Sequence, residues 1–210
     1  AYGLSIATNG FISGTPTNAG TFSATLTASN SLGSTNQVAT FTIANGTPVI
    51  SNWPSASPIT YGQALSNSVL TGGSANVPGA FAWVNSTYKP NTGTSSQSVR
   101  FSPAANYNSL TSSISLVVNK ASPVLTWTPS PAAALTYPTV LSSTQLNATS
   151  SVAGTFTYNP TNGTVLNAGT NTLVATFTPT DTANYTTGGT ITNTVVVGRA
   201  TPTITWTNPA

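Results

Sequence analysis

The sequence has no cysteine, no histidine and no methionine, and Asp181 is its one acidic side chain. Without cysteine it has neither a disulfide nor a thiolate metal site. Acid–base and nucleophilic catalysis need a base near its working pKa, usually with a carboxylate partner, and the abundant Ser and Thr hydroxyls have no histidine to activate them. We therefore expect that the chain is not an enzyme and binds no cofactor.

Charge of either sign is scarce, at 2% of the 210 residues, whereas a soluble domain typically has about 25%. The four cations are Lys89, Arg100, Lys120 and Arg199. They are scattered, and phosphate binding needs a cluster of basic residues, so we expect no nucleic-acid partner. Solubility must come from Ser, Thr and Asn, with attached glycans as a candidate shield. This composition favours an extracellular or bacterial cell-surface location.

Long apolar runs are also missing. None approaches the roughly 18–20 residues that cross a bilayer, so we expect no membrane span. The chain begins Ala1-Tyr2-Gly3, without the charged and apolar regions of a leader. This start predicts a mature or excised piece rather than a precursor.

One stretch occurs twice, as Ser98–Tyr107 and as Val174–Tyr185. Each copy has an apolar–polar alternation around a Phe, then a Pro, a polar loop and an Asn-Tyr pair. The Phe residues, Phe101 and Phe177, are 177 − 101 = 76 positions apart. That period is the size of a small β-sandwich and predicts an array of such modules.

The repeat divides the chain into four segments. We predict a partial sandwich lacking its first strands at 1–45, the N-terminal segment, and complete sandwiches at 46–121 and 122–200, the first and second repeats. Residues 201–210, the C-terminal segment, are the first strand of a next domain or a donor strand for a neighbouring subunit. Alternating apolar residues mark the strands, and no helical period is long enough for a helix.

Shared motifs connect the repeats to a known group of domains. They are Tyr61-Gly62, Pro78–Trp83 and Val118–Pro123 in the first repeat, and Gly154–Tyr158 and Phe177–Tyr185 in the second. With these motifs the chain resembles the bacterial immunoglobulin-like (Ig-like) repeat domains of large surface and secreted proteins. The N-terminal segment, with its motifs Gly3-Leu4-Ser5, Gly10–Pro16 and Ala19–Phe22, resembles a separate Ig-like family.

The resemblance implies an all-β fold of tandem Ig-like β-sandwiches arranged end to end. Such modules serve as stalks, as adhesins and as attachments to enzymes. The joins here are only a few residues long and contain no Gly/Ser-rich linker, so we expect a semi-rigid rod.

Asp181 and the lysines are the remaining candidates for chemistry. Calcium takes 6–8 oxygen ligands, usually with several carboxylates, so we interpret Asp181 as a cap of its own loop. Some surface Ig-like domains form Lys–Asn crosslinks beside a buried acid. Lys89 and Lys120 have no acid in their own repeat, and we expect no crosslink.

The aromatic residues allow a sugar-binding interpretation, with the tryptophans as platforms: Trp53, Trp83, Trp127 and Trp206. However, the last three each follow an apolar residue by two positions, which places both on one strand face and favours core packing. Exposed tryptophans would favour a binding module instead. Tyr107 and Tyr185 are expected to fill one end of the core and to anchor a loop through their hydroxyls.

Five Asn-x-Ser/Thr triplets are candidate glycosylation sites: Asn45, Asn85, Asn147, Asn162 and Asn184. A candidate inter-subunit strand is formed by Thr201, Pro202, Thr203, Ile204, Thr205 and Trp206. It could insert into the open N-terminal segment of another chain by β-strand addition. Alternatively, both ends are limits of a longer polypeptide that continues covalently into neighbouring Ig-like domains.

The preferred hypothesis is a structural component of an extracellular rod, stalk or filament, with self-association head-to-tail or covalent continuation. The alternative is an adhesin or carbohydrate-binding module of a large secreted surface protein.

Overall fold

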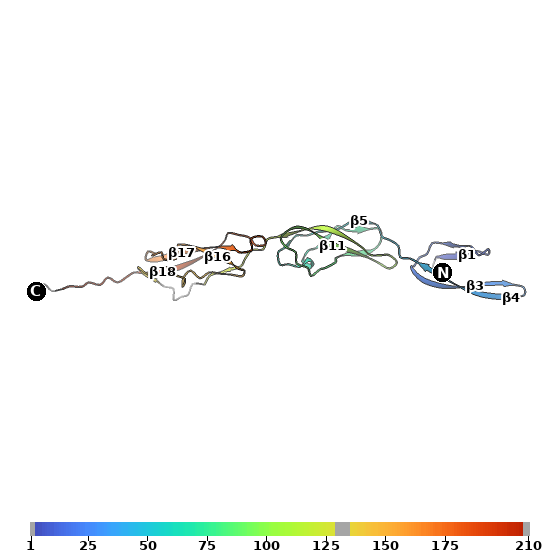
Figure 1. The fold of residues 1–210 in the computed structure, drawn as a ribbon, viewed down its shortest axis with the longest axis horizontal. Coiled ribbons are helices and arrows are strands. Elements are labelled where there is room, and N and C mark those ends of the chain that lie inside the picture. Colours follow the sequence, from blue (N-terminus) through green and yellow to red (C-terminus); the bar gives the residue numbers. More distant parts are fainter. Residues whose placement is uncertain (1–2, 129–134, 208–210) are drawn as a thin grey trace. The chain divides into compact units, whose positions relative to one another are not determined.

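The computed structural model describes residues 3–128 and 135–207 (Figure 1). In these ranges every regular element is a β-strand except one short 3-10 helix, η1 (Leu65–Asn67). The all-β, Ig-like sandwich fold is therefore confirmed. Contacts divide the chain into two compact units, residues 1–59 with 63–117, and residues 60–62 with 118–210. The four segments named above stay a prediction, and their names are kept for description.

The N-terminal segment consists of two antiparallel hairpins. The short hairpin pairs β1 (Leu4–Ile6) with β2 (Ile12–Gly14), and the long hairpin pairs β3 (Gly20–Asn30) with β4 (Gly33–Ile43). The alternation read from the sequence gives the long strands, and a two-residue turn joins them. The Oδ1 atom of Asn30 accepts the Leu32 N–H at 2.8 Å, which closes the turn.

The first repeat contains a four-stranded sheet in the order β10-β11-β12-β7. Its strands are β7 (Ile59–Thr60), β10 (Gly79–Trp83), β11 (Gly93–Pro103) and β12 (Leu110–Asn119). Phe81 lies opposite Phe101 in the β10–β11 pair, and Gly79 lies opposite Pro103.

The second repeat builds the same sheet in the order β16-β17-β18-β14. Its strands are β14 (Leu135–Thr136), β16 (Gly154–Asn159), β17 (Gly169–Pro179) and β18 (Gly189–Gly198). Phe156 lies opposite Phe177, and Gly154 lies opposite Pro179. The two repeats therefore share the strand order of this sheet and the register of the strand pair that contains the two phenylalanines.

Short strand pairs accompany each four-stranded sheet. In the first repeat β5 (Ile50–Asn52) pairs with β9 (Ser74–Ala75), and β6 (Ser55–Ala56) pairs with β8 (Leu70–Thr71). In the second repeat β13 (Leu125–Thr126) pairs with β15 (Thr149–Ser150).

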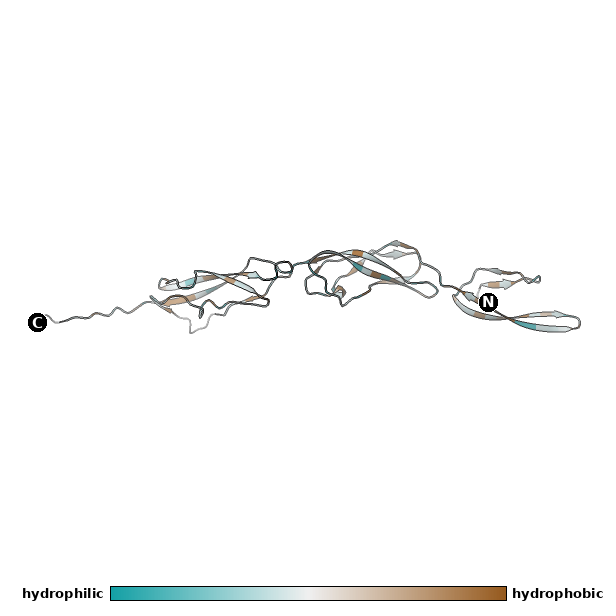
Figure 2. Ribbon diagram, in the orientation of Figure 1, coloured by the Kyte–Doolittle hydropathy of each residue, from teal (hydrophilic) through white to brown (hydrophobic). Residues whose placement is uncertain are grey.

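The cores of the repeats use corresponding positions. Six pairs of buried residues match in order along the chain: Ile59 and Leu135, Leu65 and Leu141, Val99 and Ala175, Phe101 and Phe177, Leu116 and Val195, Val118 and Val197. Leu65 lies in η1 and Leu141 outside any strand, whereas the other five pairs come from strands in which hydrophobic and hydrophilic residues alternate, as the colours of Figure 2 show. Three of the six pairs keep the residue type and three change it, but corresponding positions are buried in both repeats.

Candidate interaction surfaces

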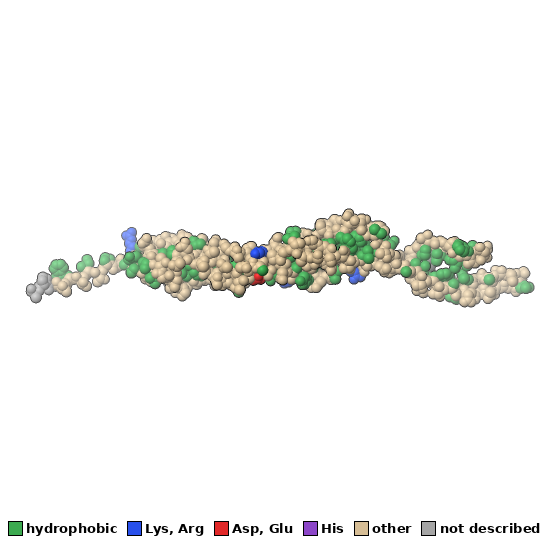
Figure 3. All heavy atoms as spheres, turned by 45° about the horizontal axis from the view of Figure 1, so that its top comes forward, with side chains coloured by type: hydrophobic (Ala, Val, Ile, Leu, Met, Phe, Trp, Pro, Cys, Tyr) green, Lys and Arg blue, Asp and Glu red, His purple; other side chains and the backbone are tan. Residues whose placement is uncertain are grey.

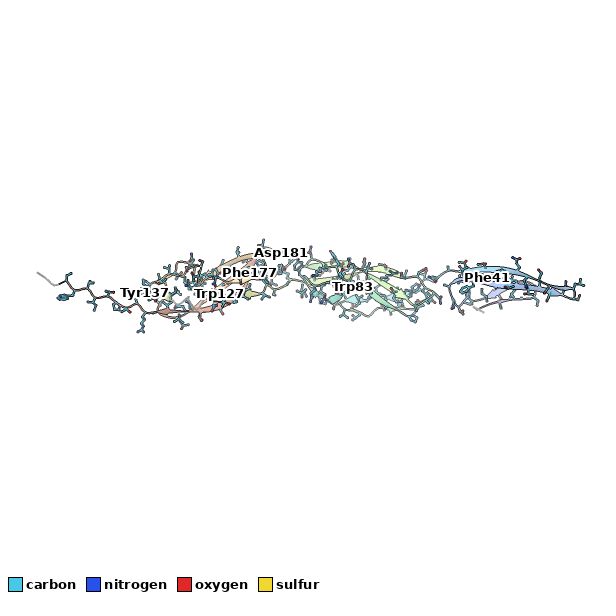
Figure 4. The ribbon with its side chains drawn as sticks, turned by 90° about the horizontal axis from the view of Figure 1, so that it is seen from below. Phe41, Trp83, Trp127, Tyr137, Phe177 and Asp181 are labelled. Carbon is cyan, nitrogen blue, oxygen red and sulfur yellow. The ribbon has the colours of Figure 1, made fainter. Side chains whose placement is uncertain are left out.

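The two hairpins of the N-terminal segment enclose an open apolar groove of about 290 Å³. It is lined mainly by apolar side chains of all four strands: Leu4, Ile6, Ile12, Phe22, Leu26, Phe41 and Ile43. Hydrophobic atoms are visible between the hairpins in Figure 3, and Figure 4 labels Phe41 on β4. In residues 3–47 no side chain reaches the burial of the repeat cores. The groove, which we call the N-terminal groove, is a core face without a cover in the described chain.

The C-terminal segment is the second uncovered apolar feature. Its described part, residues 201–207, belongs to no strand, and Ile204 and Trp206 are 90% and 84% exposed. Thr203, Ile204 and Trp206 correspond to Val124, Leu125 and Trp127 of the second repeat. There, Leu125 pairs with Ser150 in the β13–β15 ladder, and Trp127 is 8% exposed. A strand needs a partner to form, and residues 201–207 have none among the described residues.

The Asn-Tyr loop of the first repeat binds Gly46 at the start of that repeat; we call Gly46, and the corresponding Ala121 at the boundary of the second repeat, the linker residues. The Gly46 N–H donates to the Asn106 carbonyl at 2.8 Å, and the Asn108 N–H donates to the Gly46 carbonyl at 2.8 Å. Together these bonds form a parallel β-bridge between Gly46 and Tyr107. The Oδ1 atom of Asn106 also accepts the Ala19 N–H at 2.9 Å. The loop thus ties the linker and the 17–19 turn to the first repeat.

The Asn-Tyr loop of the second repeat makes the same connection. The Ala121 N–H donates to the Asn184 carbonyl at 3.0 Å, and the Thr186 N–H donates to the Ala121 carbonyl at 2.9 Å. A parallel bridge again joins the linker residue, Ala121, to the tyrosine, Tyr185. The Lys120 ammonium adds a 2.7 Å bond to the Thr182 carbonyl.

Asp181 caps this second loop, as the sequence predicted. Its two carboxylate oxygens accept the Asn184 N–H at 3.1 Å and the Asn184 side-chain amide at 2.8 Å. The side-chain bond from Asn184 is the largest of the effects that lower the pKa of Asp181. Desolvation, the second-largest effect, acts in the opposite direction, and weaker contributions from backbone bonds of Asn184 and Ala183 and from the charge of Lys120 add to the lowering of the pKa. The carboxylate is thus a structural acceptor that holds the loop closed.

Comparison with known families matches one part of the chain. Residues 2–46 match the family model described as Putative Ig domain. This part of the chain is therefore similar to an Ig-like domain. The match covers the two hairpins that line the N-terminal groove, and it confirms the resemblance drawn from the N-terminal motifs. No curated protein matches the chain. The match indicates an Ig-like protein of the surface or structural kind, a class of domain that is typically not enzymatic.

In this Ig-like context the tryptophans are mostly structural. Trp127 is buried and its indole N–H donates to the Gln145 carbonyl at 2.9 Å. The Trp83 indole N–H donates to the Ser68 carbonyl at 3.1 Å, and the ring of Trp53 packs edge-on against Phe81 at 5.7 Å. Figure 4 shows Trp83 and Trp127 within the ribbons of their own repeats. The core interpretation is confirmed for Trp127, whereas Trp206 is exposed in the described chain.

The two tyrosines of the Asn-Tyr pairs do not fill the ends of cores, so that prediction is wrong. Tyr107 is 39% exposed, and its ring lies against Gly46. Tyr185 is half-buried and meets the ring of Tyr61 edge-on at 5.4 Å within the second compact unit. Both tyrosines are held beside a linker because the flanking backbone pairs with that linker.

The candidate glycosylation sites differ in how accessible their amides are. Asn45, Asn85, Asn147 and Asn162 are exposed. Asn184 is half-buried, and its side-chain nitrogen, to which a glycan would be attached, donates to Asp181.

The described ranges, residues 3–128 and 135–207, contain neither a cluster of metal ligands nor a membrane-spanning helix. In these ranges no three His, Cys, Asp or Glu side chains come together as a metal site would need. No helix in the same ranges is both long enough and apolar enough to cross a bilayer.

Sequence reasoning missed the pairing of the Asn-Tyr loops with the linkers. A signal was present in the sequence. At each repeat boundary a small residue, Gly46 or Ala121, lies two positions before a proline. Periodicity cannot reveal such pairing, since a single isolated bridge leaves no alternation in the sequence.

Proposed function

We propose that the chain is a structural segment of an extracellular rod, stalk or filament on a bacterial cell surface, built from tandem Ig-like domains. The observation that carries the proposal is that the two repeats share the strand order of their main sheet and the register of its Phe-containing strand pair, each repeat being entered through a short hydrogen-bonded linker. Tandem repetition of one module through short linkers produces an elongated chain, as a rod or stalk requires.

Small-angle X-ray scattering of the purified chain tests this role. A rod predicts a maximum dimension near the summed lengths of the modules and a distance distribution with a long tail. A bell-shaped distribution typical of a globular particle would contradict the rod.

We further propose that chains join head to tail, with residues Thr201–Trp206 of one copy inserted into the N-terminal groove of the next. Two uncovered apolar features support this pairing: the groove, and the exposed Ile204 and Trp206. The corresponding Leu125–Thr126 stretch forms strand β13 of the second repeat, which supports a strand role for the C-terminal segment. Insertion would supply main-chain partners as well as apolar contacts.

Substitutions at neighbouring positions of this segment provide the test. Ile204→Asp places a charge on the face that would enter the groove, and Thr205→Asp places the same charge on the opposite face. By sedimentation velocity, we expect the full chain and Thr205→Asp to form oligomers that grow with concentration. Ile204→Asp should stay monomeric. Neither residue packs against a repeat, so folding is not at risk.

Two results would reject strand insertion. One is a full chain that stays monomeric at every concentration, which would leave covalent continuation into neighbouring domains as the way in which the groove is covered. The other is an Ile204→Asp variant that assembles as well as the full chain. The rod proposal survives both results, because it depends on the modules and not on how chains join.

The alternative role, an adhesin or carbohydrate-binding module, requires exposed aromatic side chains in a cluster. In the described chain three of the four tryptophans make the packing contacts given above, which leaves Trp206 alone. We therefore retain the structural role. Glycans on the four exposed asparagines are part of the proposal as a shield for an almost uncharged surface. An intact mass equal to the 21.2 kDa of the bare chain would exclude them.

A further inference from the structure

The Asn-Tyr loops pair with the linkers in the same way although the loops themselves differ. From Phe to Asn there are five positions in the first repeat (106 − 101) and seven in the second (184 − 177). In both, the Asn carbonyl accepts the linker N–H, and the residue after the Tyr donates to the linker carbonyl. Two loops of unequal length reach one pairing, so the pairing does not follow from loop length alone.

Each loop reaches this geometry by its own local means. In the shorter loop Asn106 takes a left-handed backbone with φ of 73°, a conformation that asparagine tolerates better than most residues. In the longer loop the Asp181 carboxylate binds both the backbone and the side chain of Asn184. The left-handed backbone in one loop and the Asp181 cap in the other both orient the Asn carbonyl toward the linker N–H.

The linker residue is small in both repeats. A Cβ atom at position 46 would lie 3.0 Å from the Tyr107 ring, tighter than most real contacts. Alanine occupies the corresponding position 121 beside Tyr185. The Tyr107 ring therefore lies directly against the Gly46 backbone, although both residues remain exposed.

We propose that each Asn-Tyr loop is a clasp that binds the linker entering its own repeat and holds that linker in one conformation. In the first repeat the clasp also engages the N-terminal segment, since Asn106 bonds Ala19 and, at 3.4 Å, the Thr17 carbonyl. The stiffness of each joint is then set by main-chain pairing with a loop and not by the composition of the linker. This inference goes beyond the proposed function, because it concerns the joints whatever the array is used for.

Hydrogen exchange on the full chain, read by NMR at single amides, tests the clasp. Ala121→Pro removes the N–H that donates to Asn184. Ala200→Pro is the matched control, because Ala200 holds the corresponding position before residues 201–207 and pairs with no Asn-Tyr loop in the described chain. We expect exchange at Thr186 to accelerate about tenfold in Ala121→Pro and to stay unchanged in Ala200→Pro.

Ala121→Pro could disturb the whole second repeat, and the amides of Val195 and Val197 would then lose their protection from exchange. A second variant, in the first repeat, tests the clasp independently of that outcome. Asn106→Gly keeps the left-handed backbone accessible and removes the side-chain bonds to Thr17 and Ala19. We expect faster exchange at Ala19 and Gly46, with protection at Val99 retained. The clasp proposal is wrong if the amides of Gly46, Asn108 and Thr186 in the unmodified chain exchange as fast as amides in an unstructured peptide. It is also wrong if Asn106→Gly leaves Ala19 and Gly46 unchanged.

Discussion

At the scale of single residues, Gly79 and Gly154 show how closely the two repeats share their packing. A Cβ atom on Gly79 would meet the ring of Phe101 and the Ser102 carbonyl, and one on Gly154 would meet the ring of Phe177 and the Thr178 carbonyl. The missing side chain lets a buried phenylalanine lie across the start of the neighbouring strand. In each repeat the centroid of that ring also lies 4.9 Å from the ring centroid of a second phenylalanine, Phe81 or Phe156. Glycine is thus required here by close approach.

Asp181 gives a pH dependence that can be traced to one group. Its pKa is lowered in the folded chain, chiefly by the Asn184 side chain, so the ionised form favours folding. This contribution is complete above the unfolded pKa, about 4, and is lost as pH falls through the lower folded value. With no other acidic side chain and no histidine, we expect urea-unfolding stability to be flat from about pH 5 to pH 7 and to fall slightly below about pH 4.

Asp181→Asn should remove most of that acidic decline while retaining the fold. The measurement is the urea midpoint of the second repeat at each pH, followed through an amide of β17. A decline of equal size in Asp181→Asn would show that another group is responsible.

At the scale of elements, the same strand carries a different interior residue in each repeat. Position 114 of β12 is Ile, whereas the corresponding position 193 of β18 is Asn, and both side chains are half-buried. The Asn193 side-chain amide donates to the Trp127 carbonyl at 2.8 Å. The second repeat therefore fastens the end of β13 to β18 with a hydrogen bond where the first repeat has an aliphatic side chain.

This contact leads to a prediction for β18. Asn193→Ala removes the bond and leaves the half-buried Trp127 carbonyl without this donor, so we expect a loss of about 1–3 kcal/mol in the free energy of unfolding. Thr192→Ala, on the exposed face of the same strand, should change it by less than about 0.5 kcal/mol. Chemical denaturation followed by Trp127 fluorescence or by NMR compares the two. Equal losses in both variants would mean that Asn193 acts only through strand propensity.

At the scale of the whole molecule, each repeat has its own set of buried residues, and the structure separates into two compact units. Phe101 is 1% exposed and lies within the core of the first repeat. Deleting a buried phenylalanine side chain typically costs about 3–5 kcal/mol. Because such a cavity is local, we expect Phe101→Ala to destabilise the first repeat and to leave the core of the second repeat intact.

Native-state hydrogen exchange of Phe101→Ala resolves this at single amides. Protection should fall at Val99 and Leu116 and persist at Ala175 and Val195. Phe177→Ala is the matched variant and should give the reverse pattern. If either substitution lowers protection in both repeats equally, the two cores unfold as one cooperative unit.

The sequence by itself determined the strands and their buried faces. Alternation around Phe101 and Phe177 predicted β11 and β17, the turn at Asn30–Gly33 predicted the long hairpin, and the motif period predicted two equivalent sandwiches. Asp181 was also assigned correctly, because a lone acid near Asn residues in a loop has a local role. All of these depend on residues close in the chain, where side-chain period and turn chemistry act directly.

Only the tertiary structure decided what the loops and open faces contact. Alternation tells which side of a strand is apolar, but it does not tell which segment covers that side. The sequence predicted an open N-terminal segment, but the residues that line its groove, the exposure of Trp206 and the position of Tyr107 against Gly46 required the structure. The pairing of Gly46 with Asn106 joins backbone groups 60 positions apart (106 − 46). Main-chain hydrogen bonds carry no residue signature, so this contact is set by the folded geometry.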